Sequence, residues 1–175
     1  MLATDNARLN RLDARVTAIA CDAEDGAALA AAGLSPGSAD RVLMNPPFHD
    51  ASRANLSPDP LRRLAHAAAP GLLQRWADSA ARLLKPQGVL TLIWRADALA
   101  DVLAALKAEF GSIGILPVLA REGAPAIRVL VRATKGGTAT PVNYAALTLN
   151  DAHGRPTAVA EAVLRGGQTL SVNER

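Results

Sequence analysis

The segment Arg-Val-Leu-Met-Asn-Pro-Pro-Phe, residues 41–48, shows how this 175-residue chain is organised. Three apolar side chains follow one another directly before the asparagine, and they predict a short buried strand. Two consecutive prolines then end that strand, because proline donates no backbone hydrogen bond and restricts the preceding residue to extended conformations. Asn45 is therefore expected at the carboxyl end of a strand, in a kink with a rigid backbone.

Strands and helices alternate on both sides of this segment, with Gly and Pro marking most of the boundaries. The expected elements are helix 2–12, strand 16–21, helix 25–32, strand 41–44, loop 49–68, helix 70–84, turn 85–88, strand 89–94, helix 97–110, strands 113–119 and 126–133, a strand-like segment 144–149 and a helix near 157–165. This alternation is typical of an open α/β sheet.

The last two long strands are expected to form an antiparallel hairpin. Only residues 120–125 separate them, which is too short for a parallel crossover. The sequence thus predicts a mostly parallel sheet closed by an antiparallel hairpin. In open α/β sheets the ligand site lies beyond the carboxyl ends of the strands, where Asn45 is expected.

Composition restricts the kinds of protein that this chain can be. Half of the residues are hydrophobic and a fifth are charged, as in an ordinary globular domain. A net charge of +3 permits a polyanionic partner without requiring one. The single cysteine, Cys21, and three scattered histidines predict neither a disulfide nor a metal site, and we expect a cytoplasmic protein. No apolar run approaches the roughly 20 residues of a membrane helix.

The kink carries groups suited to methylation of an exocyclic amine on a nucleic-acid base. Such an amine must be held by two hydrogen-bond acceptors so that its lone pair faces the electrophile. The side-chain oxygen of Asn45 and the backbone carbonyl of Pro46 can supply them, with Pro47 stiffening the turn. Phe48 offers a flat face on which a base can stack. The structural alternative is that the prolines only end the strand and that Phe48 belongs to the core.

Residues 45–48 resemble the Asn/Asp-Pro-Pro-aromatic motif of class I amino-methyltransferases. Residues 83–90 resemble the helix-turn-strand entering their fifth strand, and residues 122–133 and 149–154 resemble the tail of bacterial valine-tRNA adenine-N6 methyltransferases. The resemblance implies a Rossmann-like class I methyltransferase sheet, S-adenosylmethionine as cofactor and adenine N6 in tRNA as target. It implies that Asn45, Pro46 and Pro47 bind the amine and that Phe48 stacks the base.

The resemblance also implies which residues contact the cofactor. Asp22 matches the acidic residue that contacts the cofactor adenine amine, with Ala23 beside it, and Asn45 is a further expected contact. Asp22 is equally well explained as a cap of the helix expected at 25–32. Arg53, Arg62 and Arg63 could contact RNA phosphates, although solvated loop charges explain them equally well.

Two features of the family are missing from this sequence: the Gly-rich loop after its first strand and the acidic residue ending its second. Residues 2–12 resemble the helix that follows that second strand. We therefore expect an N-terminally truncated gene product or a partial sequence, whose sheet lacks the first two strands. Residues 1–135 would form the partial methyltransferase domain and residues 136–175 its C-terminal extension. This chain alone is expected to bind S-adenosylmethionine weakly or not at all.

Alternative functions remain open at this point. The same motif occurs in guanine-N2 rRNA, adenine DNA and release-factor glutamine methyltransferases, and with His49 added it resembles the guanine-N2 rRNA enzymes most. The tail at residues 122–154 favours the tRNA enzymes. A chain without the Gly-rich loop could also be an inactive, truncated RNA-binding fragment.

Overall fold

A computed structural model describes residues 2–47, 49–50, 67–68 and 71–170 of the chain. The chain divides into two compact units, Met1–Ser35 and Pro36–Arg175, and each is considered by itself. No helix among the described residues is long and apolar enough to cross a membrane.

The first unit contains two short helices, α1 (Leu2–Leu9) and α2 (Gly26–Ala31). Asp25 caps α2, since its Oδ1 accepts the backbone N–H of Ala27 at 2.9 Å and of Ala28 at 3.0 Å. After the helix, Gly33 takes a positive φ of 89°, which suits a glycine that ends a helix. The expected helix at 25–32 is confirmed, and its cap is Asp25 rather than Asp22.

The expected strand at residues 16–21 is wrong, because these residues form no strand. Apolar residues in a row favour an extended backbone, but a strand also needs a neighbour that accepts and donates backbone hydrogen bonds. No described strand pairs with this segment.

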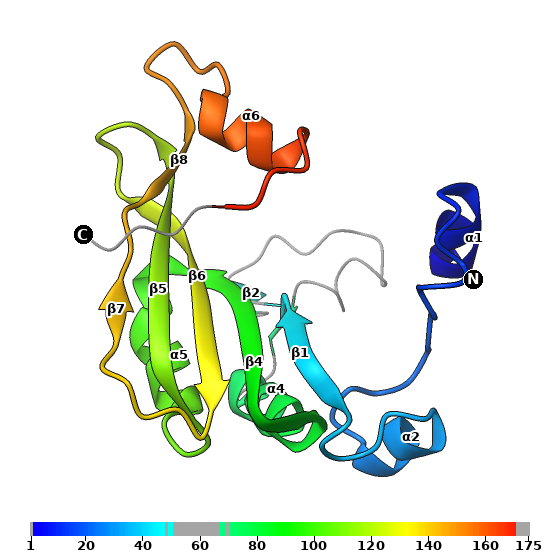
Figure 1. Cartoon of the computed structure of the whole chain (residues 1–175). Coiled ribbons are helices and arrows are strands. Elements are labelled where there is room, and N and C mark those ends of the chain that lie inside the picture. The colour runs from blue at the N-terminus through cyan, green and yellow to red at the C-terminus, as the bar shows by residue number, and fades with distance from the viewer. Residues whose placement is uncertain (1, 48, 51–66, 69–70, 171–175) are drawn as a thin grey trace. The chain divides into compact units, whose positions relative to one another are not determined.

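The second unit is a mixed α/β sheet with helices (Figure 1). Its elements are β1 (Ala39–Met44), β2 (His49–Asp50), β3 (Ala67–Ala68), α4 (Leu72–Leu83), β4 (Leu84–Arg95), η1 (Ala96–Ala98), α5 (Leu99–Leu106), β5 (Phe110–Arg121), β6 (Ala126–Lys135), β7 (Val142–Asn143), β8 (Leu147–Asn150) and α6 (Ala158–Leu164). The expected loop at 49–68 lies mostly outside the described residues, although β2 and β3 at its ends pair in parallel.

The main sheet has the order β1-β4-β6-β5-β7, and β8 pairs with another part of β5. β1 is parallel to β4, whereas β6 lies between β4 and β5 and is antiparallel to both. β7 and β8 are parallel to β5, so β6 is the one reversed strand of the described sheet. This arrangement confirms the expected fold class, a mostly parallel sheet with an antiparallel hairpin near its C-terminal end.

The turn expected at residues 85–88 is a bulge inside β4. Ala39 pairs with Leu84, and Arg41 pairs with Val89. One residue of β1, at position 40, therefore lies opposite four residues of β4, at positions 85–88. The bulge places Gln87 at a positive φ of 64°. A Cβ on Gly88 would lie 2.9 Å from the backbone oxygen of Lys85, which explains the glycine. The helix expected at 97–110 is shorter in the structure: α5 covers Leu99–Leu106, and β5 already begins at Phe110.

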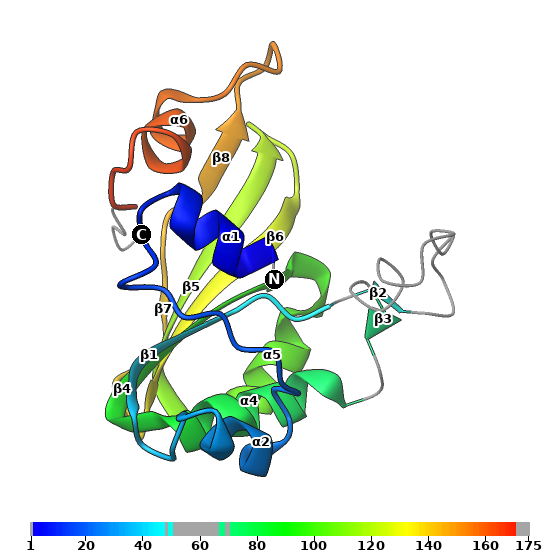
Figure 2. The ribbon, with the colours of Figure 1, turned by 90° about the vertical axis from the view of Figure 1, so that its right-hand side faces the viewer.

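Helices α4 and α5 cover one face of the sheet (Figures 1 and 2). Alternate residues of the central strands point into this core, where Leu90, Leu92 and Val131 are 0–1% exposed. Lys135 of β6 fixes the end of α4, because its Nζ donates to the carbonyl of Ala81 at 2.6 Å. The positions of β1, β4 and β6 therefore depend on one helix-covered core.

The opposite face carries a smaller apolar cluster, built on Leu116 and Val118 of β5 and Leu147 of β8. Leu43 of β1 points to the face opposite the core, since its neighbours Val42 and Met44 pack on the core. Its side chain is 80% exposed. The sheet thus has one fully packed face and one that is partly open.

Leu92→Ala should lower the free energy of unfolding by about 2–5 kcal/mol, because it leaves a cavity in the helix-covered core. Leu43→Ala is the matched control on the paired strand and should change stability by less than about 0.5 kcal/mol. Urea unfolding followed by circular dichroism measures both. Equal losses for the two variants would contradict the assignment of the two faces.

Candidate active site at the carboxyl ends of β1 and β4

Asn45 follows β1 directly, at the edge of the sheet where the carboxyl ends of parallel strands meet. Met44 pairs with Leu92, so the residues after β1 lie alongside the last residues of β4. The parallel register therefore places Asn45 where open α/β sheets bind their ligands.

The three residues of the kink differ in their exposure to solvent. Pro46 is less than 2% exposed, whereas Asn45 is exposed and Pro47 is half-buried. The buried proline ring fixes the backbone while the amide of Asn45 stays accessible to a ligand. Among the described residues, none forms a hydrogen bond with the Asn45 side chain. Phe48, the predicted stacking residue, lies outside the described residues.

An ion pair occupies the same edge just beyond β4. Arg95 Nε donates to Asp97 Oδ1 at 2.9 Å, and a terminal guanidinium nitrogen pairs with Oδ2. This two-point hydrogen bond holds the pKa of the Asp97 carboxyl below its ordinary value of 3.8 and raises that of Arg95. Asp97 therefore stays ionised at neutral pH, so it does not act as a general acid there.

A cavity of about 330 Å³ opens between the first turn of α4 and helix α5. Its lining includes Trp94 near the end of β4, Gly71 and Gln74 before and in α4, and Asp101 in α5. Gln74 Nε2 donates to Asp78 Oδ1 at 2.9 Å and to the carbonyl of Ala105 at 3.3 Å, which links the two helices. The cavity lies near the carboxyl end of β4 and offers an apolar wall with a carboxylate at its rim.

Asp22 and Ala23 belong to the first unit, so their position relative to Asn45 stays a prediction. Both residues are exposed. Asp22 Oδ1 accepts the backbone N–H of Glu24 at 2.9 Å, which leaves its other oxygen available to a donor. Because Asp25 caps α2, helix capping no longer explains Asp22.

For the remaining predicted residues, the structure describes no side chain. Arg53, Arg62 and Arg63 lie outside the described residues. His49 begins β2, and its side chain is not described. Within the described part of the chain, no group of three or more His, Cys, Asp or Glu residues could hold a metal ion.

Sequence patterns did not single out Trp94, Gln74, Asp101 or the Arg95–Asp97 pair as site residues. Trp94 is buried, at 7% exposed, and also lines the cavity. A useful signal was available: charged residues immediately after a buried strand lie at the ligand-binding edge of a parallel sheet.

The strand order with β6 reversed is a Rossmann-like methyltransferase fold. A predicted O-methyltransferase from Agrobacterium tumefaciens has this fold, with a TM-score of 0.76 and 23% identity over 97% of this chain and 72% of that one. A second solved structure, M1.HpyAVI in complex with SAM, has a TM-score of 0.40 and 11% identity over 74% of this chain and 66% of that one, which is too low to support an argument. No protein-family model and no curated protein matches the sequence.

Arg95→Gln should raise the pKa of Asp97 toward 3.8, because the variant removes the charged partner of the carboxylate. The stabilisation by the pair is fully present above the unfolded pKa of Asp97, and it is lost progressively as the pH falls through the lower folded value. Carboxyl-detected NMR titration measures the shift. Asp40, whose pKa is lowered by Lys85, is the internal reference and should titrate as in the wild type.

Proposed function

We propose that this chain carries the amine-binding part of a methyltransferase that uses S-adenosylmethionine and acts on an exocyclic amino group of a nucleic-acid base, adenine N6 in tRNA. The observation that supports the proposal is the exposed amide of Asn45, held at the carboxyl edge of a methyltransferase sheet by the buried ring of Pro46. Asn45, Pro46 and their place at the edge of the sheet all fit a site that binds an amino group, called here the amine cradle.

The kink can orient an amine without acting as a base. The Asn45 oxygen accepts one N–H, and the Pro46 carbonyl can accept the other, which turns the nitrogen lone pair away from both. S-adenosylmethionine would supply an electrophilic methyl group to that lone pair. As the nitrogen–carbon bond formed, the sulfur–methyl bond would break, S-adenosylhomocysteine would leave with the bonding electron pair, and the nitrogen would release its extra proton to solvent. Catalysis by this chain would consist mainly of positioning.

The described residues fit the adenine end of the cofactor better than its methionine end. Asp22 has a free carboxylate oxygen that could accept the adenine amine, with Ala23 beside it. No described strand leads through a Gly-rich turn into a helix of the kind that holds the methionine part. The cofactor contacts of Asp22, Ala23 and Asn45 are therefore part of the proposal, and weak binding by this chain alone remains the prediction.

An RNA substrate is proposed from chemistry at the same edge. A planar base needs an accessible cavity, and one opens at Trp94, near the carboxyl end of the strand that pairs with β1. A net charge of +3 is compatible with a polyanion. The resemblance of residues 122–154 to the tRNA enzymes favours adenine in tRNA over guanine N2 in rRNA.

Methylation of a hydroxyl group is the second candidate, because one solved structure with the same fold is a predicted O-methyltransferase. A hydroxyl group has one proton and becomes a good nucleophile when a base removes it. The Asn45 amide is not a base, and two fixed acceptors suit an NH2 group better. We therefore place amine methylation first. An inactive RNA-binding fragment remains the third possibility.

Asn45→Ala should lower methyl transfer by about a hundredfold, since the amine loses its positioning acceptor. The assay uses protein expressed from its complete reading frame, tritiated S-adenosylmethionine and tRNA from a strain lacking the gene. Asn143→Ala is the control, because it removes an exposed asparagine from the short strand β7. Undiminished turnover in Asn45→Ala, with unchanged thermal unfolding, would contradict the proposed role.

Deleting the gene should remove N6-methyladenosine from one tRNA and leave rRNA nucleosides unchanged. Mass spectrometry of nucleosides from purified tRNA and rRNA measures this. Loss of N2-methylguanosine from rRNA would move the target to guanine. An unchanged nucleoside profile together with methylation of a small hydroxyl compound would favour the O-methyl alternative.

A further inference from the structure

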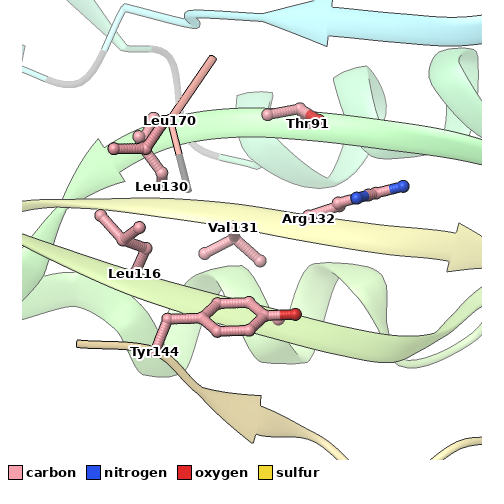
Figure 3. Close-up of a pocket in the computed structure, with 8 residues that line it drawn as sticks. Thr91, Leu116, Leu130, Val131, Arg132, Tyr144 and Leu170 are labelled. Carbon is pink, nitrogen blue, oxygen red and sulfur yellow. The ribbon is translucent and has the colours of Figure 1, made fainter. Parts of the chain in front are cut away.

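A second cavity, of about 160 Å³, lies on the sheet face opposite α4 and α5. It is lined by side chains from β4, β5 and β6, together with Tyr144 and Leu170 (Figure 3). The leucines Leu116, Leu130 and Leu170 gather at one end of this pocket, and Arg132 and Thr91 lie toward the other. The pocket is therefore amphipathic along its length.

Gly114 and Tyr144 shape one wall of the pocket. The backbone N–H of Tyr144 donates to the carbonyl of Ile115 at 2.8 Å, which fixes the residue against β5. A Cβ on Gly114 would lie 2.6 Å from Cε2 of Tyr144, so the aromatic ring lies directly on the glycine. In Figure 3 the ring lies flat across β5. Glycine at position 114 thus provides the space for an aromatic wall.

The polar end of the pocket carries one positive charge. Arg132 is the charged residue among those that line it, and no described residue forms an ion pair with its guanidinium group. Thr91, which pairs with Arg132 across β4 and β6, and the Tyr144 hydroxyl add hydrogen-bonding groups. An anionic group that accepts two hydrogen bonds would complement this end.

The volume of the pocket, about 160 Å³, suits a ligand whose apolar part is one ring. An apolar protein cavity of about 150 Å³ holds a molecule of benzene. We propose that this pocket binds a single-ring aromatic carboxylate, with the ring between Tyr144 and the leucines and the carboxylate on Arg132. Such a ligand contacts both ends of the pocket, whereas a neutral ring forms no ion pair with Arg132 and a small anion leaves the leucines uncovered.

The residues that line this pocket are different from those proposed to hold the amine, because neither Asn45 nor Pro46 is among them. Loss of activity in an Asn45 variant would therefore not test the pocket, and loss of ligand in an Arg132 variant would not test the cradle.

Titration of the ¹⁵N-labelled protein with benzoate tests the proposal. Saturable chemical-shift changes should centre on the amides of Thr91, Gly114 and Arg132. Benzamide, which keeps the ring without the charge, and acetate, which keeps the charge without the ring, should each bind at least about tenfold more weakly. Benzamide binding as tightly as benzoate, or no saturable binding of benzoate, would overturn the proposal.

Variants separate the pocket from the rest of the surface. Arg132→Gln should weaken benzoate binding at least about tenfold. Arg82→Gln, which removes an exposed arginine from α4, should leave it unchanged. Gly114→Ala should also weaken binding, because the added methyl group displaces Tyr144. If Gly114→Ala does not fold, Arg132→Gln still tests the proposal, provided that its own spectrum is that of a folded protein. Unchanged affinity in Arg132→Gln would exclude the proposed carboxylate contact.

Discussion

The parallel pairing of β1 with β4 is the constraint on which the candidate active site depends. Every described main-sheet hydrogen bond of β1 is made to β4, and β4 is held on its other side by β6. The ion pair between Lys85 and Asp40, at 2.6 Å, joins the starts of the two strands but is exposed and adds little. The position of Asn45 at the sheet edge therefore follows from backbone pairing and from the core beneath it.

The features that could be predicted from the sequence are those decided by local chemistry. Asp25 and Gly33 bound α2 because a capping carboxylate and a positive φ need no distant partner. The short link at residues 120–125 required an antiparallel hairpin whatever the rest of the sheet did. In contrast, residues 16–21 have a strand-like composition but no described neighbour, and the bulge at Gln87 depends on how β4 pairs with β1.

The residues of the candidate site also fall into those that local sequence predicts and those that only the tertiary structure brings together. The place of Asn45 was predictable because a strand and two prolines define it within eight consecutive residues. Trp94 and Asp101 meet in one cavity only after α4 and α5 pack on the sheet, so no local pattern identified them together. Tyr144 and Arg132 are likewise brought together by the pairing of β5 with β6 and by the backbone bond to Ile115. The roles of Asp22 and Phe48 remain predictions.

Alternation along the reversed strand β6 lets one sheet support two chemically different faces. Val131 is fully buried in the helix-covered core, and the next residue, Arg132, points to the opposite face beside Thr91. A slip of one residue in the pairing of β6 with β4 would exchange these side chains and bury a charge, which costs several kcal/mol without a partner. The register that protects the core therefore also places the guanidinium group at the second pocket. The two sites share this constraint, although their ligands would contact different side chains.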